Sequence, residues 1–389
     1  MLSIDEARAI VLAETGRLGD EPVPLSGALY RVLTRDVVAV GSVPSFDNSA
    51  MDGFAVRSGP AQRRLEIVDE SRAGAPAHAA VGPGEAIRIS TGAMLPTGAD
   101  AVVQSERADV DRDVVIPLVD VRPGDNVRRV GDDLVAGRVV LEAGRRLGPV
   151  EIGSAATAGV GELRCALRPK VSIVSTGDEL VDPGDPLGPG QIYESNSLSL
   201  AALARHAGAE VTALRRARDT PQAARSAIGA ALDEADVVVL TGGVSVGPHD
   251  HVKPALEALG VREAFWRVAM RPGRPIWFGA RDRTLVFGLP GNPVSAVVTF
   301  ILFARPAINA LQGAQPYPPR GRAVMTHDVD RHPDRDECVR VRIIAGRATS
   351  TGPQDSHILS SLLDADGLAI VTRGSGVLAA GDPVEIEAL

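Results

Sequence analysis

Apolar residues near the N-terminus recur with the spacing of one helix face. The residues with this spacing are Ile4, Ala7, Ile10 and Val11. Ser3 precedes them and Glu6 follows three positions later, which is the spacing of a capping box. Acidic residues are interspersed among the apolar ones, which is not typical of a secretory signal peptide. Residues 1–16 therefore predict an amphipathic helix.

A different pattern runs from about residue 47 to residue 141. Short apolar runs are broken by glycine, proline and aspartate, as in "GPGEAIRIS", "GADAVVQSE" and "VRPGDNVRRVGDD". Tight turns at such short intervals are typical of a small all-β module. The same pattern returns after residue 313, in "RAVMTHDV", "ECVRVRIIAG" and "GLAIVTRGSGVLAAGDPVEIEAL". It predicts a separate small β-barrel or sandwich there.

Strand and helix patterns alternate between residues 169 and 313. The segments "KVSIVS", "AEVTALRRA" and "DVVVLTGG" have the pattern of strands, and helical segments lie between and after them. Gly208 is expected to end the first helix, and Thr220 with Pro221 has the pattern of an N-cap followed by a first helical residue. This alternation predicts a doubly wound α/β sheet of parallel strands, covered by helices on both faces.

Composition narrows the class of protein. A chain of 389 residues exceeds one ordinary core, so we expect about two to four domains. Hydrophobic residues at 44% and charged residues at 23% indicate a soluble globular protein, and a net charge of −8 excludes a basic surface for nucleic acid. The longest apolar run, "AVVTFILFA" from Ala296, is too short to cross a bilayer. Cys165 and Cys338 fit neither a zinc site nor a disulfide scaffold, which favours a reducing cytoplasm.

Three glycine-containing loops follow predicted strands: "TGDEL", "TGGVSVGPHDH" and "GLPGNPVS". Ligands of open α/β sheets bind beyond the carboxyl ends of the strands, where these loops are expected to meet. Their backbone N–H groups can approach an oxyanion. In the third loop Asn292 is a candidate N-cap before Pro293, so the helix start is expected to present unpaired N–H groups. One such loop also suits a plain turn, but three loops at one crevice predict an anion site.

Three acidic residues accompany these loops: Glu179, Asp219 and Asp250. Carboxylates are unfavourable beside an anion unless a cation lies between them. Because Mg2+ takes one or two carboxylates and binds phosphate oxygens as well, the crevice is predicted to bind a phosphate or pyrophosphate with Mg2+ on these acids. Asp219 in "RARDT" fits a simple turn before a helix equally well. His249 and His251 are interpreted as loop residues, because no further His or Cys lies at metal-ligand spacing.

Two further segments carry candidate chemistry. The segment "VAMRPGRPIWFG" places Arg271 and Arg274 before prolines and around Gly273, which predicts two guanidinium groups on a stiff loop. They suit a second oxyanion, although two solvated arginines in a tight turn have the same pattern. The segment "PSFDNSAMDGFAV", residues 44–56, is rich in short polar side chains, and an Asx-rich turn explains it as well. No Ser-His-Asp set stands out from the sequence, so a covalent-serine hydrolase has no support.

Together these segments resemble the molybdopterin molybdenumtransferase family, which includes the C-terminal domain of gephyrin. The resemblance runs through nearly the whole chain, in "PSFDNSAMDGFAV", "RISTGAMLPTGADAVV", "VRRVGDDLVAGRVVLEAG", "PKVSIVSTGDELV", "QIYESNSLSL", "TGGVSVGPHDHVKPAL", "MRPGRPIWFG", "GLPGNPVSA" and "SHILSSL". It implies the last step of molybdenum cofactor biosynthesis, in which molybdate is inserted into adenylated molybdopterin with Mg2+ and AMP is released. It also implies a cytoplasmic homodimer with clefts that use both protomers. Molybdopterin adenylyltransferase and recipient apo-molybdoenzymes are the implied partners, without nucleic acid or membrane.

The resemblance implies a role for individual residues. The implied catalytic residues are Asp52, Thr91, Glu179, Asp219, Asp250, Arg271 and Arg274. The implied substrate-binding residues are Thr176, Gly242, Gly243, Ser245, Gly291, Asn292, Pro293 and Ser295, with Arg340 and Ser356 contributed by the C-terminal domain to the molybdate pocket. Family members usually carry lysines where this chain has Arg271 and Arg274. Arginine is bulkier and donates in a planar fork, which leaves the preference between molybdate and tungstate open.

The resemblance also implies four domains. They are an elongated helical and β linker (1–46 and 138–167), a β-rich domain (47–137), an α/β molybdopterin-binding domain (168–313) and a C-terminal β-barrel (314–389). Two other functions compete with the transferase. A scaffold protein without turnover would tolerate loss of the acids or the arginine pair, yet all five positions are charged. The adenylyltransferase that activates molybdopterin shares the α/β fold and the "TGG" loop, but it leaves the "FDNSAMDG" module and the C-terminal β domain unexplained.

Overall fold

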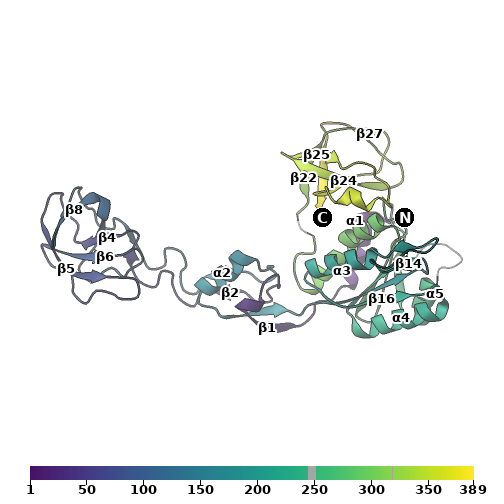
Figure 1. Ribbon diagram of the computed structural model, residues 1–389, viewed down its shortest axis with the longest axis horizontal. Coiled ribbons are helices and arrows are strands. Elements are labelled where there is room, and N and C mark those ends of the chain that lie inside the picture. The colour runs from purple at the N-terminus through teal and green to yellow at the C-terminus, as the bar shows by residue number, and fades with distance from the viewer. Residues whose placement is uncertain (244–250, 318) are drawn as a thin grey trace.

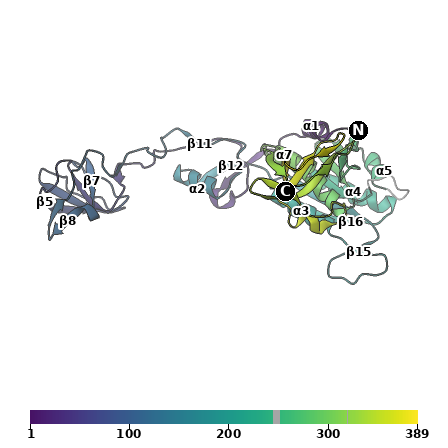
Figure 2. The ribbon, with the colours of Figure 1, turned by 90° about the horizontal axis from the view of Figure 1, so that it is seen from above.

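The chain forms an elongated molecule with a large body at one end and a small β module at the other. The computed structural model describes residues 1–243, 251–317 and 319–389. In Figures 1 and 2 a narrow linker separates the distal module, which contains β4 (Gly53–Val56), from the body, where both termini lie. The chain crosses the linker twice, in β1 (Asp20–Pro24) and β12 (Glu162–Ala166), which pair antiparallel. The distal module thus lies apart from the body of its own chain.

A six-stranded mixed sheet organises the body. In spatial order its strands are β16 (Glu210–Ala217), β13 (Lys170–Thr176), β17 (Val237–Thr241), β21 (Thr284–Leu289), β20 (Trp277–Arg281) and β18 (Arg262–Trp266). The first four are parallel, as predicted. The fifth strand, β20, runs antiparallel to both of its neighbours, β21 and β18, so the prediction of a parallel sheet is wrong for this edge. The reason is a tight turn between β20 and β21, in which Asp282 has a φ of +53°.

Helices cover both faces of this sheet, as predicted. On one face lie α1 (Ile4–Glu14), α3 (Asn196–His206), α6 (Pro293–Thr299) and α7 (Arg305–Leu311), and on the other lie α4 (Pro221–Glu234) and α5 (Val252–Ala258). A π-helical turn, Phe300–Ala304, joins α6 to α7. The resulting stretch, Pro293–Leu311, is long and apolar enough to cross a membrane, but 78% of its apolar window is buried inside the protein, as in the core helix of a globular body.

The predicted N-terminal helix is confirmed together with its cap. The Ser3 hydroxyl accepts the Glu6 N–H at 3.2 Å, and the Glu6 carboxylate accepts the Ser3 N–H at 2.7 Å. Ile4, Ala7 and Val11 are buried in the core of the α/β body. Helix α1 therefore belongs to the packing of the body, although the residues that follow it build the linker.

The C-terminal residues form a closed barrel. Its ring consists of β24 (Asp336–Ile344), β25 (Arg347–Ser350), β22 (Gly321–Met325), β28 (Pro383–Ala388) and β26 (Gly367–Val371), which pairs back with β24. Outside this ring, β23 (Val329–Asp330) pairs with β27 (Val377–Leu378). A further strand, β19 (Met270–Arg271), comes from the α/β body and pairs with β24 in parallel. The segment that carries Arg271 and Arg274, which we call the arginine loop, is therefore joined to the barrel by strand pairing.

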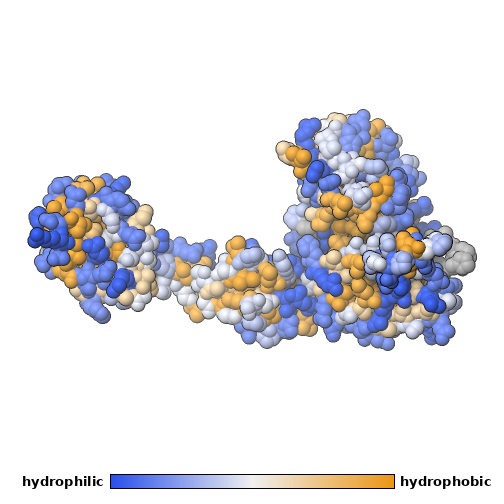
Figure 3. Space-filling view, in the orientation of Figure 1, coloured by the Kyte–Doolittle hydropathy of each residue, from blue (hydrophilic) through white to orange (hydrophobic). Residues whose placement is uncertain are grey.

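The distal module and the linker complete the chain. The sheet of the module contains β7 (Ala101–Gln104), β4, β6 (Glu85–Ile89), β5 (Leu65–Ser71), β9 (Val114–Pro117) and β8 (Ala108–Asp111), and β3 (Asn48–Ser49) pairs with β10 (Val127–Arg128). The linker adds β2 (Val37–Val38), β11 (Val139–Leu141) and α2 (Pro149–Thr157). Val40 and Val150 of the linker are 73% and 77% exposed, and Figure 3 shows apolar surface in orange over this part of the chain.

Both cysteines are free and buried, so we expect them to be unreactive in the folded protein. Burial raises the pKa of the Cys338 thiol to about 12 and also raises the pKa of Cys165. The thiolate is the reactive form of cysteine, and these shifts suppress it. With the thiol reagent DTNB at pH 8, the native protein should release no thionitrobenzoate within minutes, and the protein unfolded in guanidinium should release two equivalents. Rapid release from the native protein would contradict this expectation.

Candidate functional site

A cavity of about 810 Å³ opens at the carboxyl ends of the parallel strands β13, β17 and β21. Residues of all three predicted loops line it. Of the residues expected in the site, those in the lining are Thr176, Glu179, Asp219, Gly242, Gly243, Gly291, Asn292 and Pro293. Ser245 and Asp250, as well as His249, lie outside the described residues. The fold thus brings the three glycine-containing loops around one crevice.

Two glycines let the second loop approach the first. Gly242 and Gly243 have φ values of +85° and +63°. A Cβ atom on Gly242 would lie 2.9 Å from Thr176 Oγ1, and one on Gly243 would lie 2.7 Å from Val252 Cγ2. A larger residue would therefore push the second loop away from Thr176 and from the start of α5.

Two of the predicted acids face the cavity. The carboxylate of Glu179 lies over Gly177, where an added Cβ would be 2.4 Å from a carboxylate oxygen. Asp219 and Asp178 brace two loops, because the carboxylate of each accepts the backbone N–H of the other at 3.4 Å. Asp219 is thus both a loop residue and part of the cavity wall. His251 precedes α5 without capping it through its side chain, and it is not among the lining residues.

The donor set suits Mg2+ better than a metal that needs a protein cage. In residues 1–243, 251–317 and 319–389 there is no group of three or more His, Cys, Asp or Glu side chains that could hold a metal ion. Glu179 and Asp219 nevertheless line one cavity beside glycine-containing loops. Mg2+ commonly takes only one or two carboxylates from the protein and completes its coordination with water and substrate phosphates. The residues present therefore fit Mg2+ bound together with a phosphate ligand.

A second cavity, of about 280 Å³, adjoins the first. The two share Pro275, Pro290, Asn292 and His357. Arg271, Arg274 and Arg335 line the second cavity. Glu337 lies 3.9 Å from Arg271 Nη1 and 3.5 Å from Arg335 Nε, so it offsets part of their charge. Three guanidinium groups around a small space suit a compact dianion.

Gly273 gives the arginine loop its shape. Its φ is +105°, as its place between the two arginines predicts. A Cβ atom here would lie 2.4 Å from Thr299 Cγ2 of α6. Pro272 and Gly273 are buried, whereas Arg271 and Arg274 are exposed. The loop therefore packs its Pro-Gly part against the helix and leaves both guanidinium groups free to face a ligand.

The start of α6 differs from its prediction. Asn292 does precede Pro293 at the helix start, but its side chain makes no capping bond. Instead Asn292 Nδ2 donates to Ser356 Oγ at 2.8 Å, and the Val294 N–H donates to the Ser356 carbonyl oxygen at 3.1 Å. The expectation of unpaired N–H groups is therefore wrong for Val294, because a loop of the barrel accepts its hydrogen. Ser356 lines the arginine cavity and joins the barrel to it, while Ser295 lines it from α6.

Arg340 lies behind the cavities and is not among the residues that line either one. Its side chain is completely buried. Its Nε donates to Ser361 Oγ at 3.1 Å, and its Nη2 donates to the carbonyl oxygens of Pro353 and Asp355 at 3.1 and 3.3 Å. Burial lowers the pKa of Arg340. Arg340 therefore supports the loop that presents Ser356, and its direct contribution to the molybdate pocket stays a prediction.

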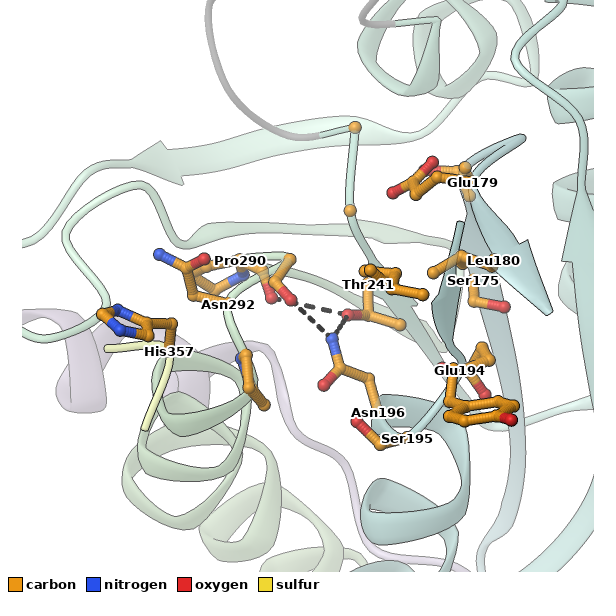
Figure 4. Close-up of a pocket in the computed structure, with 18 of the residues that line it drawn as sticks. Ser175, Glu179, Leu180, Glu194, Ser195, Asn196, Thr241, Pro290, Asn292 and His357 are labelled. Atoms are coloured by element: carbon orange, nitrogen blue, oxygen red, sulfur yellow. Dashed lines mark hydrogen bonds between the residues drawn. The ribbon is translucent and has the colours of Figure 1, made fainter. Parts of the chain in front are cut away.

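Several lining residues escaped the sequence analysis, among them Asn196, Arg335 and His357. Asn196 Nδ2 donates to Thr241 Oγ1 at 3.0 Å and to the Gly291 carbonyl oxygen at 2.7 Å, which ties two loops together (Figure 4). A signal was present, since Asn196 lies in the segment "QIYESNSLSL" and begins α3. Arg335 in "DRDEC" has no local signal, because only the pairing of β19 with β24 brings it to the cavity.

Asp52 and Thr91 lie together but far from both cavities. The Thr91 N–H donates to Asp52 Oδ1 at 2.8 Å, and both residues are exposed. They belong to the distal module, at the opposite end of the molecule from the body (Figure 1). Within a single chain the expected site is therefore divided into two separate parts.

Known proteins match this chain over its full length. The family description "MoeA N-terminal region (domain I and II)" matches residues 2–159, "Probable molybdopterin binding domain" matches 172–310, and "MoeA C-terminal region (domain IV)" matches 322–389. The molybdopterin molybdenumtransferase of Haemophilus influenzae is 37% identical over 398 residues, which cover 100% of this chain and 98% of the relative. The chain belongs to the molybdopterin molybdenumtransferase family.

Other molybdopterin molybdenumtransferases agree with this assignment. Molybdopterin molybdenumtransferase 2 of Mycobacterium tuberculosis is 39% identical over 405 residues, covering 99% of both chains. The solved structure of the molybdopterin biosynthesis MoeA protein from Pyrococcus horikoshii OT3 superposes with a TM-score of 0.86 at 29% identity and covers 100% of both chains. The matches include the distal module and the barrel, which the adenylyltransferase alternative leaves unexplained.

Proposed function

We propose that this protein inserts molybdate into adenylated molybdopterin with Mg2+ and releases AMP, which yields molybdenum cofactor. The observation that carries the proposal is the pair of adjoining cavities, one with glycine-containing loops and two carboxylates, the other with three arginines. Two anionic groups held side by side repel each other unless positive charge is supplied around them. A cytoplasmic location and the four-domain division given above are parts of the same proposal.

The larger cavity would hold the phosphates of the adenylate. Backbone N–H groups around Gly242 and Gly291 can approach phosphate oxygens, since these residues carry no side chain in the way. Glu179 and Asp219, together with Asp250, would hold Mg2+, which supplies positive charge to the phosphate oxygens while AMP is displaced. Asn196 keeps two of the loops at a fixed separation through its two hydrogen bonds.

The smaller cavity would hold molybdate. Arg271, Arg274 and Arg335 would donate hydrogen bonds to its oxygens, and Ser356 lies beside them. The dithiolene sulfurs of the substrate have to reach molybdate from the larger cavity. They would pass the shared wall at Asn292 and His357, which borders both cavities.

We further propose that a second copy of the chain completes the site. Asp52 and Thr91 cannot join the arginines of their own chain, because the linker holds them at the far end of the molecule. A homodimer in which each distal module reaches the body of the partner would bring both parts together. The exposed valines of the linker, including Val40 and Val150, supply apolar surface for such an association.

The direct test is AMP release from adenylated molybdopterin by the purified protein. Release is expected only when both Mg2+ and molybdate are present, and EDTA should abolish it. A parallel reaction with tungstate measures how the arginine pair selects between the two oxyanions. Binding of the adenylate without any release on addition of either oxyanion would contradict the transferase and favour a scaffold or carrier.

Two inactive variants are expected to restore activity when they are combined. Asp52→Ala removes the acid of the distal module, and the double variant Arg271→Ala with Arg274→Ala removes the pair of the body. In a random mixture of co-expressed chains, half of the dimers are mixed, and each mixed dimer has one intact composite site, so about one quarter of the wild-type activity is expected. The measurement is AMP release by the mixture beside each variant alone. If all residues of a site came from one chain, the mixture would remain as inactive as its components.

A further inference from the structure

A third cavity, of about 380 Å³, lies where the linker meets the body, and we call it the joint cavity. Three arginines line it: Arg145 and Arg146 come from the linker, and Arg305 comes from α7. Asn309, one turn further along α7, lines it as well. None of its described lining residues belongs to the other two cavities. The proposed transferase activity therefore leaves the joint cavity without a role.

The side chain of Arg146 reaches from the linker to the body. Its Nη1 donates to the Tyr30 carbonyl oxygen in the linker at 2.9 Å. Its Nη2 donates to two acceptors in the body, the Ala207 carbonyl oxygen at 3.1 Å and Asn309 Oδ1 at 2.9 Å. Gly208 has a φ of +88° and leaves room for this guanidinium, because a Cβ there would lie 2.6 Å from Arg146 Nη1. The position of Arg146 at the cavity is therefore fixed by both parts of the chain.

The three arginines of the joint cavity carry more positive charge than their carboxylate partners offset. Arg145 pairs with Glu151 at 2.8 Å. Arg305 pairs with Glu387 at 3.1 Å, but that carboxylate is shared with a second arginine. Within residues 1–243, 251–317 and 319–389 the Arg146 side chain bonds only to neutral acceptors and forms no ion pair. The cavity wall therefore has an excess of positive charge.

Partial burial makes this excess charge unfavourable. Burial, and after it the positive charge of Arg168, lowers the pKa of the Arg146 guanidinium. Burial also lowers the pKa of Arg305. Arginine keeps its proton in proteins, so these shifts indicate charged groups that lack a sufficient negative partner. A buried charge is normally paired, and an anion in the cavity would pair with these arginines.

We propose that the joint cavity binds a tetrahedral oxyanion of the phosphate class, which links the linker to the body. Guanidinium groups donate to phosphate oxygens in pairs of parallel hydrogen bonds. The donors come from two elements, the linker and α7, and the oxygens of phosphate point in four directions, whereas those of a carboxylate lie in one plane. The joint cavity is larger than the arginine cavity of about 280 Å³, so a small phosphomonoester fits as well.

Titration calorimetry of the full chain with inorganic phosphate tests the proposal. The starting protein carries Arg271→Ala and Arg274→Ala, and the buffer contains EDTA, so that neither the arginine cavity nor Mg2+ attracts the probe. This protein is expected to bind phosphate, and to bind acetate more weakly. Arg145→Gln should weaken phosphate binding by about tenfold, as expected for loss of one charge-assisted hydrogen bond. A parallel titration with ribose 5-phosphate shows whether the free ion or a phosphomonoester binds more tightly.

A second variant supplies the negative partner from the protein itself. Asn309→Asp places a carboxylate beside Arg146 Nη2 and should abolish phosphate binding. Arg138→Gln is the matched control, since it removes the same charge from an exposed residue of the linker that lines none of the three cavities, and it should leave phosphate binding unchanged. Tryptophan fluorescence during unfolding confirms that each variant is folded.

Four results would overturn the proposal. They are no phosphate binding by the starting protein, acetate binding as tight as phosphate binding, unchanged phosphate binding in Arg145→Gln or Asn309→Asp, and equal weakening by Arg138→Gln. AMP release is measured separately on the chain with Arg271 and Arg274 intact. A protein that binds phosphate in the joint cavity but releases no AMP would contradict the transferase and leave this site standing.

Discussion

Gly273→Ala is expected to lower molybdate-dependent AMP release by about a hundredfold, because a displacement of about 1 Å at reacting groups has effects of this size. The new Cβ would lie 2.4 Å from Thr299 Cγ2 of α6, and the φ of +105° is unfavourable for alanine. Both effects would move Arg271 and Arg274 away from the proposed molybdate site. The measurement is kcat and the molybdate KM at saturating adenylate. AMP affinity should stay at the wild-type value, since the phosphate loops are not altered.

A second substitution separates the steric contact of Gly273→Ala from its effect on the backbone. In the double variant with Thr299→Ser, serine removes Cγ2 and keeps the hydroxyl that donates to the Ser295 carbonyl oxygen at 2.7 Å. Recovery of release in the double variant would assign the loss to the contact with Thr299, and no recovery would assign it to the backbone conformation. Thr299→Ser alone is the matched control and should release AMP like the wild type. Wild-type release and molybdate KM in Gly273→Ala itself would contradict the role of this loop.

Local patterns predicted most of the elements, because the signals that define them are local. The capping box of Ser3 and Glu6, the N-cap at Thr220, the helix end at Gly208 and the turn at Gly273 are all found where the sequence places them. The antiparallel edge of the sheet was missed, since its signal is a short turn at Asp282 inside an otherwise ordinary α/β pattern. Local signals specify an element and its ends, whereas the relative direction of two neighbouring strands depends on the connection between them.

Local sequence patterns predicted the residues of the site less completely than they predicted the helices and strands. Glu179 follows β13, a parallel strand whose carboxyl end opens on the cavity, so its proximity to the cavity could be expected. The family resemblance predicts Arg340 in the pocket, and the structure shows its buried Nη2 donating to two carbonyl oxygens of the loop that carries Ser356. Arg335 is brought to the pocket by strand pairing between two domains. Such contacts join residues that are far apart in the sequence, so no local spacing pattern predicts them.

The junction between the barrel and the body depends on a buried carboxylate. Glu387 of β28 accepts hydrogen bonds from Arg8 of α1 at 2.8 Å and from Arg305 of α7 at 3.1 Å. The side chains of Glu387 and Arg8 are 3% and 6% exposed. This cluster joins the N-terminal helix, the core helix and the barrel. It thereby fixes the barrel loop that carries Ser356 against the arginine cavity.

Glu387→Gln is expected to destabilise the protein by about 3–5 kcal/mol, because it leaves the buried Arg8 and the largely buried Arg305 without this negative partner. Both tryptophans lie in the α/β body, so their fluorescence during guanidinium unfolding reports this loss. The matched control is Glu385→Gln on the same strand. The Glu385 side chain is 53% exposed, and its carboxylate pairs with Arg320 Nη1 at 2.6 Å at the edge of the cluster. An exposed pair of this kind contributes about 0–1 kcal/mol. Because the cluster also orients the barrel loop, the folded fraction of Glu387→Gln should show a raised molybdate KM. Equal stability of the two variants would mean that strand pairing alone holds the barrel in place.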